Sequence, residues 1–492
     1  MLTKEMLSPY LPVNWSWLLL TAVVAYSSFW ILKFIQHRRS YHNLPTPPHS
    51  LLYGNIPQLL EARKKFPPDM HPLAYFTSIA QTYNMRGLFY LDTYPIAELI
   101  VVIIDPDVAK QIQTSPKTFT RHPEALRFLK DVLGAKGIFF ALGETWSRTR
   151  GWFKPAFSMS HLLTLVPGGI LEETLVFKEI LTELSASKRK FRMFDLLQRL
   201  TFDLIGRTVA DVRTRSQTEY SAVQVWHSNA IRAVPDKGNS IWKRLAKTII
   251  FYWSIRNLDK HLLKMIRDKY KNGRENDRDM SILDLALRGY SRDKGTLDDG
   301  NMARVDLDPE FMEIALDNAK TFYAAGADST PYVLGYIYYH LTKNPKILSR
   351  VRAEHNQVSG NHIETTLSNI KAKPHLLNDL PFTQAILKES LRLHHIGAIP
   401  RKAVPGSTAT FEGRTYPIDH HMLLILGGCH PARSSLFLLP EHLRSRSLPT
   451  TRFPPRFEVG IYAIRERAQR LYRPATGSIR DENCACFDAE VL

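Results

Sequence analysis

The sequence predicts a mainly α-helical protein with small β-sheets, preceded by an N-terminal transmembrane helix. Apolar residues recur at helical spacing after Asp105, and only short runs such as residues 97–104 (AELIVVII) have the character of strands. The 492 residues are 44% hydrophobic and show no internal repeat, so they can bury one large core. We therefore expect a single domain over residues 57–430, with an exposed, charge-rich loop at residues 267–300.

The N-terminal apolar segment, residues 15–35, reads WSWLLLTAVVAYSSFWILKFI and is long enough to cross a bilayer as a helix. Tryptophans near both of its ends suit the two membrane–water interfaces. A cleaved signal peptide is the alternative, but its apolar stretch would be shorter and a small-residue cleavage site would follow, whereas Lys33, Arg38 and Arg39 occur here. The positive-inside rule then places residues 1–14 in the lumen and the body of the protein in the cytoplasm.

Residues 36–56 are basic and rich in proline, which predicts a hinge between the membrane and the folded body. The run LPTPP at residues 44–48 fixes φ at three positions and favours extended backbone. The whole chain carries a net charge of +18, which suits an anionic membrane surface. Nucleic acid is not an expected partner, because basic and aromatic side chains do not interleave in any patch of the sequence.

The longest helical signal begins at Asp308-Pro309, where an N-cap precedes proline at the first helical position, and continues to Asn344-Pro345. Small residues at positions 324–327 would let another group approach the backbone closely. Pro331 cannot donate a hydrogen bond to the carbonyl of Ala327, which predicts a kink with a free carbonyl. A packed helix with a tolerated kink is the alternative to a proton-handling group formed by Asp328, Ser329 and Thr330.

Two other segments place pairs of side chains on one helical face. In residues 385–393 (AILKESLRL), Glu389 and Arg392 lie three residues apart and can form an ion pair. Trp146 and Arg150 lie four residues apart, and a donor beside a guanidinium suits an anionic group. Each of these spacings is common when it occurs alone.

In their order along the chain, these features strongly resemble the membrane-bound, microsomal type of the cytochrome P450 family of haem-thiolate monooxygenases. The resemblance rests on the anchor, the proline-rich hinge, Trp-x-x-x-Arg, Ala-Gly-x-Asp-Ser-Thr, and Glu-x-x-Arg followed by Pro400-Arg401. It implies the P450 fold, a haem (heme) cofactor, NADPH-cytochrome P450 reductase as electron donor and a lipophilic small-molecule substrate. It further implies a single-pass protein of the endoplasmic reticulum membrane, and the overall character suggests fungal secondary metabolism.

The resemblance also implies a role for each matching position. Trp146, Arg150 and Arg401 would hold the haem propionates. Asp328, with Ser329 or Thr330, would relay protons to bound dioxygen, although Ser329 stands where the family usually has Thr. Glu389 and Arg392 would form the structural ion pair beneath the haem. Substrate-facing positions, which could equally be ordinary core, would be Tyr323, Ala324, Ile396 and Ile399.

Two further motifs of the family are missing from this chain. One is Phe-x-Pro-(Glu/Asp)-Arg-Phe, whose Arg is the third partner of the ion pair, and the other is Phe-x-x-Gly-x-Arg-x-Cys-x-Gly, whose thiolate ligates the iron. Cys429 comes too soon after Glu389, and Cys484 and Cys486 leave no chain for the helix that follows the ligand in the family. No cysteine is therefore a credible axial ligand, and the sequence predicts no other metal site.

Reading the C-terminal tail one base out of frame restores both missing motifs. Residues 464–473 (IRERAQRLYR) can then encode Phe, Gly, Arg or Ser, Gly, Pro, Arg, Asp, Cys, Ile, Gly, and the cysteine codon overlaps Leu471. Residues 443–448 (LRSRSL) can encode Phe-x-Pro-Asp-Arg-Phe in the same frame. Degenerate codons allow many readings, yet agreement at every fixed position of both motifs is improbable by chance. Residues 431–492 are therefore interpreted as an out-of-frame tail.

Two hypotheses follow for the function. In the first, the gene encodes an active monooxygenase and the tail is a sequencing or gene-model error. In the second, the chain as written is the real product, and it is inactive because it lacks the axial cysteine. A decayed gene, a sequencing slip and a wrongly drawn intron boundary would all leave the same signature.

Overall fold

The computed structural model describes residues 15–41, 43–66, 72–115, 119–122, 127–234, 240–271, 280–295, 308–394, 397, 400–419 and 421–426. The chain divides into two compact units, each considered by itself. We call Met1–Pro68, Pro72–His122 and Ala398–His430 the sheet unit, and Asp69–His71, Pro123–Gly397 and Pro431–Leu492 the helical unit. Residues 57–430 contribute to both units, and their organisation as one domain stays a prediction.

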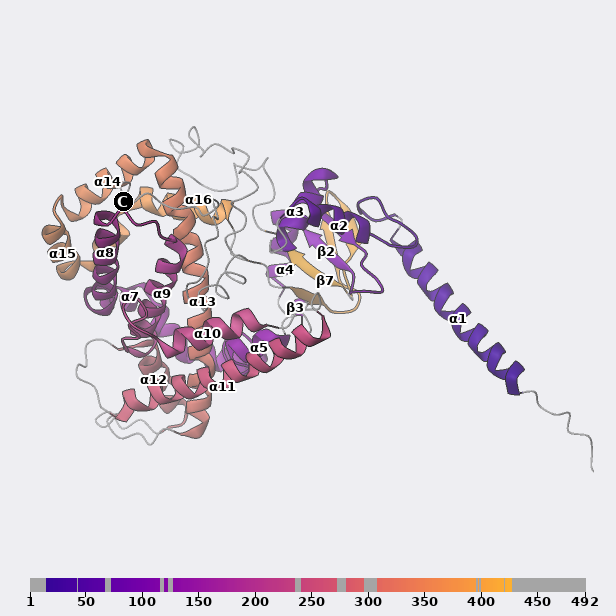
Figure 1. Cartoon of the computed structure of the whole chain (residues 1–492), viewed down its shortest axis with the longest axis horizontal. Coiled ribbons are helices and arrows are strands. Elements are labelled where there is room, and N and C mark those ends of the chain that lie inside the picture. The colour runs from indigo at the N-terminus through magenta and orange to yellow at the C-terminus, as the bar shows by residue number, and fades with distance from the viewer. Residues whose placement is uncertain are drawn as a thin grey trace, which may run out of the picture. The chain divides into compact units, whose positions relative to one another are not determined.

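In its described residues the sheet unit holds a five-stranded sheet of order β1-β2-β7-β4-β3 and a β5-β6 hairpin (Figure 1). In the larger sheet β2 and β7 run parallel, and the other neighbouring strands are antiparallel. The strands are β1 (Leu88–Leu91), β2 (Ile100–Ile103), β3 (Phe119–Arg121), β4 (Arg401–Ala403), β5 (Thr408–Phe411), β6 (Arg414–Pro417) and β7 (Met422–Ile425). The helices are α1 (Trp15–Ser40), α2 (Ile56–Lys64), α3 (Pro72–Thr82) and α4 (Pro106–Gln113).

The larger sheet is buried on both faces, which explains why β1 and β2 are continuous apolar runs. Successive side chains of a strand point to opposite faces. Phe89 and Val102 therefore belong to the cluster that includes residues of α3, whereas Leu88 and Val101 belong to the cluster that includes residues of α4. The strand expected within residues 97–104 is confirmed as β2.

The helical unit is built around the long helix α13 (Pro309–Lys343), which packs against α5, α9, α11 and α16. Asp308 caps α13 by accepting a hydrogen bond from the backbone of Glu310, so the expected N-terminus is confirmed. The other helices before α13 are α5 (Arg127–Leu133), α6 (Gly143–Phe153), η1 (Lys154–Phe157), α7 (Met159–Thr164), η2 (Val166–Ile170), α8 (Leu171–Ala186), α9 (Met193–Ala210), α10 (Ala222–Ala233), α11 (Ile241–Lys271) and α12 (Ile282–Asp293). After α13 come α14 (Pro345–Ser359), α15 (Ile363–Ala372), η4 (Pro374–Asn378) and α16 (Pro381–Leu393).

The interpretation of residues 267–300 as an exposed loop is wrong where the structure describes them. α11 continues to Lys271, and Ser281 and Asp284 form a capping box that starts α12. Lys269 neutralises Asp284 at 3.0 Å. Apolar residues of α12 then join the largest buried cluster of the helical unit: Ile282, Leu283, Ala286, Leu287 and Tyr290. The charged residues of this stretch therefore lie at helix ends and obscured an amphipathic helix.

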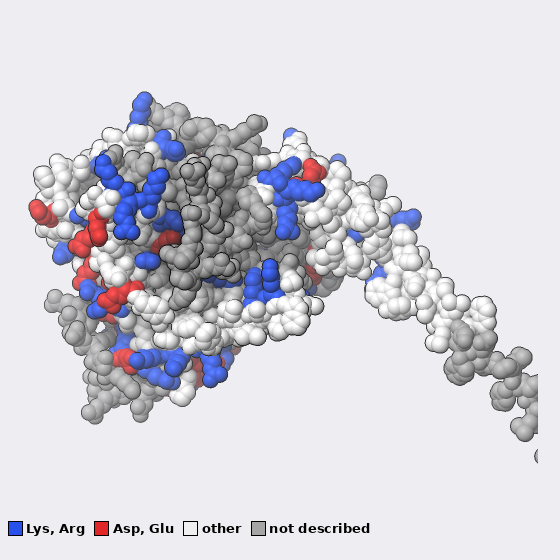
Figure 2. Space-filling model, viewed as in Figure 1, with Lys and Arg blue, Asp and Glu red and all other residues white. Residues whose placement is uncertain are grey.

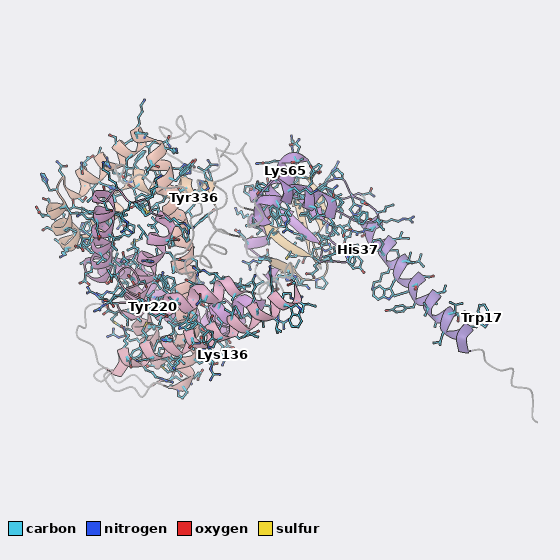
Figure 3. All side chains as sticks on the ribbon, viewed as in Figure 1. Trp17, His37, Lys65, Lys136, Tyr220 and Tyr336 are labelled. Carbon is cyan, nitrogen blue, oxygen red and sulfur yellow. The ribbon has the colours of Figure 1, made fainter. Side chains whose placement is uncertain are left out.

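Helix α1 extends beyond the predicted Ile35 to Ser40, and Figure 2 shows an almost uncoloured surface along it. By length and composition it is the one helix among the described residues that could cross a membrane. Trp17 lies near its outer end, whereas His37 lies at the end that joins the sheet unit (Figure 3).

The inner end of α1 is fixed to the sheet unit through Asp92. The buried guanidinium of Arg38 pairs with the Asp92 carboxylate, and His37 and His49 approach the same carboxylate at 3.2 and 3.0 Å. Arg38 also donates a hydrogen bond to the carbonyl of Tyr94 at 2.6 Å. Gly54 has φ +59°, and a Cβ there would lie 2.1 Å from Arg38 Nη1, so this position requires glycine.

The proline-rich run is held against the sheet unit by Asn55. Its side-chain amide donates to the carbonyls of Pro47 and Pro48, both at 3.2 Å, and its carbonyl oxygen accepts from the backbone of Asp92 at 2.9 Å. Asn55 is fully buried. The segment between α1 and α2 is therefore part of the sheet unit.

We expect Asp92→Asn to lower the free energy of unfolding of the sheet unit by about 3–5 kcal/mol at neutral pH, because it leaves the buried charge of Arg38 without a counter-ion. Urea unfolding of the full chain would measure the loss. Glu61→Gln is the matched control, since Glu61 forms only an exposed pair with Lys65 at 3.7 Å and should change stability by less than about 1 kcal/mol.

Wild type and Asp92→Asn can also be compared as a function of pH. Burial would raise the pKa of Asp92, but hydrogen bonds from His49 and Arg38 outweigh burial and hold the pKa below its ordinary value. The stabilisation by the carboxylate is thus present at neutral pH and lost as the pH falls through the folded pKa. Wild type and Asp92→Asn should therefore converge in acid, and a difference that stays constant into acid would contradict this.

Candidate functional site

The middle of α13 contains the proline that was expected to free a carbonyl. Pro331 is buried in the helix, and the Thr201 hydroxyl of α9 lies 3.4 Å from the carbonyl of Ala327 and 3.0 Å from the carbonyl of Gln198 in its own helix. The carbonyl of Ala327 is therefore not free as expected, but its contact is long, because one hydroxyl proton serves two carbonyls.

The small residues before the proline serve the same packing of α13 on α9. A Cβ added to Gly326 would lie 2.2 Å from Cδ1 of Ile205, so this side chain rests directly on the α13 backbone. A larger residue at position 326 would force the Ile205 side chain to move. The close approach predicted for residues 324–327 is thus made, among the described residues, by Ile205.

Asp328 points toward α9 and α10. One carboxylate oxygen lies 3.3 Å from the amide nitrogen of Gln198, and the other lies 3.0 Å from Nε2 of His227. The Asp328 side chain is 37% exposed, whereas that of His227 is 1% exposed. The carboxyl group therefore lies at a border between protein interior and solvent, with a buried imidazole behind it.

The two hydroxyl residues after Asp328 have different environments. Ser329 donates a hydrogen bond back along α13 to the carbonyl of Ala325 at 2.5 Å, and Thr330 is exposed. Consecutive helical residues are separated by about 100° around the axis, so the three side chains spread around α13. The structure places them in one turn without a hydrogen bond among these three described residues.

The positions considered for substrate contact are buried where they are described. Tyr323 is 1% exposed, donates to Met265 Sδ at 3.7 Å and belongs to an apolar cluster with Phe202, and burial raises its pKa. Ala324 is 7% exposed. Both residues therefore lie in the core, which was the alternative to a substrate-facing position. Ile396 and Ile399 lie outside the described residues.

Glu389 and Arg392 form the expected ion pair on α16. The guanidinium donates two hydrogen bonds to the carboxylate, at 2.8 and 2.6 Å, in a bidentate arrangement. The Glu389 and Arg392 side chains are 8% and 16% exposed, and donating hydrogen bonds to Glu389 raises the pKa of Arg392. The pair is therefore formed and largely desolvated in the absence of a described third partner.

The start of α16, and so the position of this pair, is fixed by Glu354 of α14. Its carboxylate accepts hydrogen bonds from the backbone of Phe382 at 2.6 Å and of Thr383 at 2.9 Å, which are free donors at the helix N-terminus. Burial would raise the pKa of Glu354, but these bonds and that of the Thr383 hydroxyl lower it. Sequence reasoning missed Glu354, because its partners are distant in the chain.

Trp146 and Arg150 share one face of α6 as expected. The Arg150 guanidinium lies 5.0 Å from the centre of the Trp146 ring, while Arg150 remains exposed and Trp146 half-buried. Stacking orients the cation and leaves its donors open to an anion. Glu144 begins the same helix but has no contact with this cation among the described residues.

Arg401 lies in the sheet unit, opposite Arg121 in the register of β3 and β4. Burial, and then the charge of Arg401, lower the pKa of Arg121. Like charges in register destabilise a pair of strands. An anion bound at this edge would relieve the repulsion, which is chemically consistent with a propionate.

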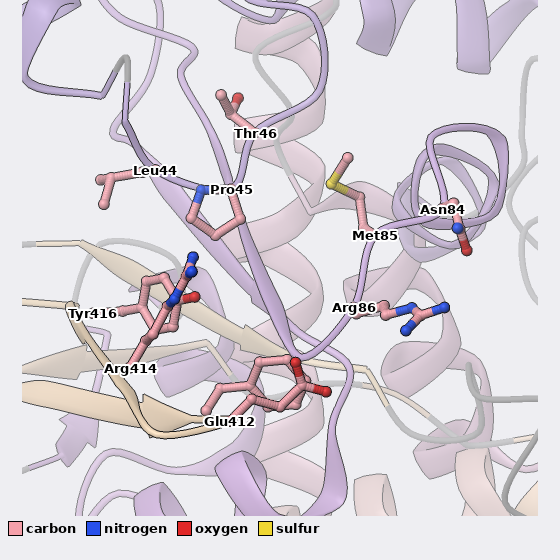
Figure 4. Close-up of a pocket in the computed structure, with 10 residues that line it drawn as sticks. Leu44, Pro45, Thr46, Asn84, Met85, Arg86, Glu412, Arg414 and Tyr416 are labelled. Carbon is pink, nitrogen blue, oxygen red and sulfur yellow. The ribbon is translucent and has the colours of Figure 1, made fainter.

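The sheet unit also contains a surface cavity of about 610 Å³ (Figure 4). Residues of the proline-rich run, of the segment before β1 and of the β5-β6 hairpin surround it. None of the predicted site residues lines it. Its lining residues are Leu44, Pro45, Thr46, Asn84, Met85, Arg86, Phe411, Glu412, Arg414 and Tyr416.

A haem needs an axial ligand and cations for its propionates. Arg150 and Arg401 fit the second requirement. The three cysteines, Cys429, Cys484 and Cys486, all lie outside the described residues, as does Leu471. The described residues contain no group of three His, Cys, Asp or Glu that could hold a metal ion. Each unit, considered by itself, therefore offers a cation that suits a propionate, whereas the described residues offer no thiolate ligand.

The chain is similar to several known cytochrome P450 proteins. The chain is 30% identical over 349 residues to cytochrome P450 monooxygenase acrF of Aspergillus aculeatus, covering 71% of this chain and 68% of that one. It is 26% identical over 401 residues to cytochrome P450 monooxygenase polC of Polytolypa hystricis, covering 79% and 69%. The crystal structure of the cytochrome P450DA haem domain matches with a TM-score of 0.61 at 20% identity, covering 78% and 77%.

The family model for cytochrome P450 matches residues 44–441, which is most of the chain. The predicted fold class, mainly helical with small sheets, is confirmed by the elements and by the structural match. Haem is the cofactor that this family and its solved structures imply. This chain belongs to the cytochrome P450 family.

Proposed function

We propose that the gene encodes a haem-thiolate monooxygenase that inserts one oxygen atom from O2 into a lipophilic small molecule of secondary metabolism, and that the chain as written is inactive. The family match and the fungal relatives support the reaction class. The observation that carries the inactivity is the absence of the Phe-x-x-Gly-x-Arg-x-Cys-x-Gly motif from all 492 residues. The Trp-x-x-x-Arg, acid–hydroxyl and Glu-x-x-Arg motifs are retained.

The residues of the helical unit support specific roles in this reaction. The Arg150 guanidinium, oriented by Trp146, would bind a haem propionate, and Arg401 of the sheet unit stays a further predicted propionate ligand. When bound, haem supplies the redox chemistry that activates dioxygen. Asp328 would hold and release a proton at its partly exposed carboxyl group, and the hydroxyl of Ser329 or Thr330 would pass it on.

The location and partners follow from the anchor. We propose that α1 crosses the endoplasmic reticulum membrane once and leaves the folded units in the cytoplasm, where NADPH-cytochrome P450 reductase would supply electrons. The length and apolar surface of α1 support this, as do Arg38 and Arg39 at its inner end. A membrane location also suits a lipophilic substrate.

The second candidate is an inactive P450 relative that is made as written. The missing haem-cysteine motif favours this candidate. So does the missing Phe-x-Pro-(Glu/Asp)-Arg-Phe motif, whose Arg completes the ion-pair network in the family. Sequencing the transcript across the codons for residues 430–443 separates the candidates: an altered frame in the messenger supports gene decay, and an unbroken P450 frame supports a drawing or sequencing error.

We expect Glu389→Gln to lower the free energy of unfolding by about 2–4 kcal/mol, because it strands the largely buried guanidinium of Arg392. Urea unfolding of the full chain in detergent measures the loss. Glu313→Gln is the matched control, since Glu313 pairs with Lys136 at 2.7 Å on the surface and both side chains are more than half exposed. Equal effects of the two substitutions would contradict a structural role for the α16 pair.

Reduced carbon-monoxide difference spectra test the functional proposal itself. The chain as written should give no thiolate-type Soret band, because it has no credible axial cysteine. A second protein, translated in the shifted frame after residue 430, should give the band. A thiolate-type band from the chain as written would overturn the inactivity, and no band from either protein would overturn the frame interpretation.

A further inference from the structure

We propose that His227 of α10 is a positioning residue for Asp328, which it orients and with which it shares a proton. The inference rests on the proposed role of Asp328 in proton transfer, and it adds a residue that no motif marks. Nothing in the sequence marks His227, which is a single histidine in an otherwise ordinary helical segment.

The geometry fixes the Asp328 carboxylate from two helices. His227 Nε2 lies 3.0 Å from one carboxylate oxygen, and the Gln198 amide nitrogen of α9 lies 3.3 Å from the other. Two contacts to different oxygens define the plane of the carboxyl group as well as its direction. Thr201, one turn after Gln198, binds the α13 backbone next to Asp328 at Ala327, so the carboxylate and its helix are held by the same face of α9.

The hydrogen bond between His227 and Asp328 can carry its proton on either partner. An imidazolium donates from Nε2 to an ionised carboxylate, and once that proton has moved across, the neutral imidazole, protonated at Nδ1, accepts at Nε2 from the carboxyl group. His227 is 1% exposed and Asp328 is 37% exposed, so the bond joins a buried base to an acid that solvent reaches. Such a bond lets Asp328 take a proton from solvent while its inner oxygen stays fixed.

Asp328 is the charged partner of His227, because the other groups near the imidazole are apolar or are hydrogen-bonded elsewhere. The ring lies 5.3 Å from Phe202 of α9 and beside the apolar cluster of Phe202, Tyr323 and Ala327. Asp203 of α9 is occupied elsewhere, by Thr214 and the backbone of Ser216 and Gln217, and the Tyr323 hydroxyl contacts Met265. Among the described residues, no other charged side chain lies within hydrogen-bond distance of the imidazole.

A buried nitrogen of the same ring has no partner. His227 Nδ1 makes no hydrogen bond to any described residue although it is inaccessible to solvent. An unpaired buried polar atom costs about 1–3 kcal/mol. Leucine would fill this apolar position without that cost, so apolar packing between the helices does not by itself explain a histidine here. The Nε2 bond to Asp328 does.

The first test uses the full chain as written, in detergent. His227→Leu, Asp328→Ala and the double variant form a cycle measured by urea midpoint, and we expect the two single shifts to be clearly non-additive. ¹⁵N NMR of labelled histidine should show an Nε2–H resonance protected from solvent exchange that both single variants abolish. Additive midpoints, or a protected resonance that survives Asp328→Ala, would overturn the proposal.

The second test separates this inference from the proposed function. In the frame-restored protein with reductase, NADPH consumption should fall at least about tenfold in Asp328→Ala and comparably in His227→Leu, as expected for loss of acid–base help. His227→Gln, which retains a donor, should recover most of the rate. Gln198→Leu is the matched control for removing the other contact, and it should lower the rate less than His227→Leu.

Each failure has a distinct signature. If Asp328→Ala leaves the rate unchanged, the proposed role of Asp328 is wrong. If Asp328→Ala lowers the rate but His227→Leu does not, Asp328 acts without His227 and the present inference is wrong. If His227→Gln is as slow as His227→Leu although both fold, a donor at position 227 is not what matters, and the positioning role is again wrong.

Discussion

The packing of α13 on α9 is the constraint on which the rest of the helical unit depends. Pro331 removes one hydrogen bond from the longest helix that the structure describes, and the Thr201 hydroxyl of α9 makes a long contact, 3.4 Å, with the carbonyl of Ala327. Gly326 lets Ile205 rest on the backbone at the same level. The interruption of the α13 hydrogen bonds thus lies at a specific contact between the two helices. Asp328 is the next residue after Ala327, so this contact also helps to fix the position of its carboxyl group.

The sequence predicted the elements whose signals are local. The cap at Asp308, the prolines at both ends of α13 and the apolar run of β2 all act within a few residues, and these elements occur as expected. Helix α12 was missed because dense charge on both sides of it outweighed a short apolar period. Its capping box and the buried pairing of Asp284 with Lys269 show that this charge supports the helix.

The candidate site was predicted less completely than the fold, because its contacts join distant segments. Spacing alone placed Glu389 beside Arg392 and Trp146 beside Arg150, since both pairs lie on single helices. Spacing could not show that Glu354 caps α16 or that Asp328 turns toward α10. In each case the two partners belong to different helices that are far apart in the sequence. The side chains that orient a site are invisible to motif reasoning when they come from other helices.

The contacts of Arg38 and His37 with Asp92 fix how α1 is joined to the sheet unit. A bare flexible linker would let an anchor spin freely in the bilayer, but Arg38 belongs to α1 itself and is buried against Asp92, with His37 beside it. If α1 turned about its axis, Arg38 and His37 would lose their contacts with the Asp92 carboxylate. The tilt and rotation of α1 in a bilayer, if it spans one as proposed, would therefore set which edge of the sheet unit faces the lipid.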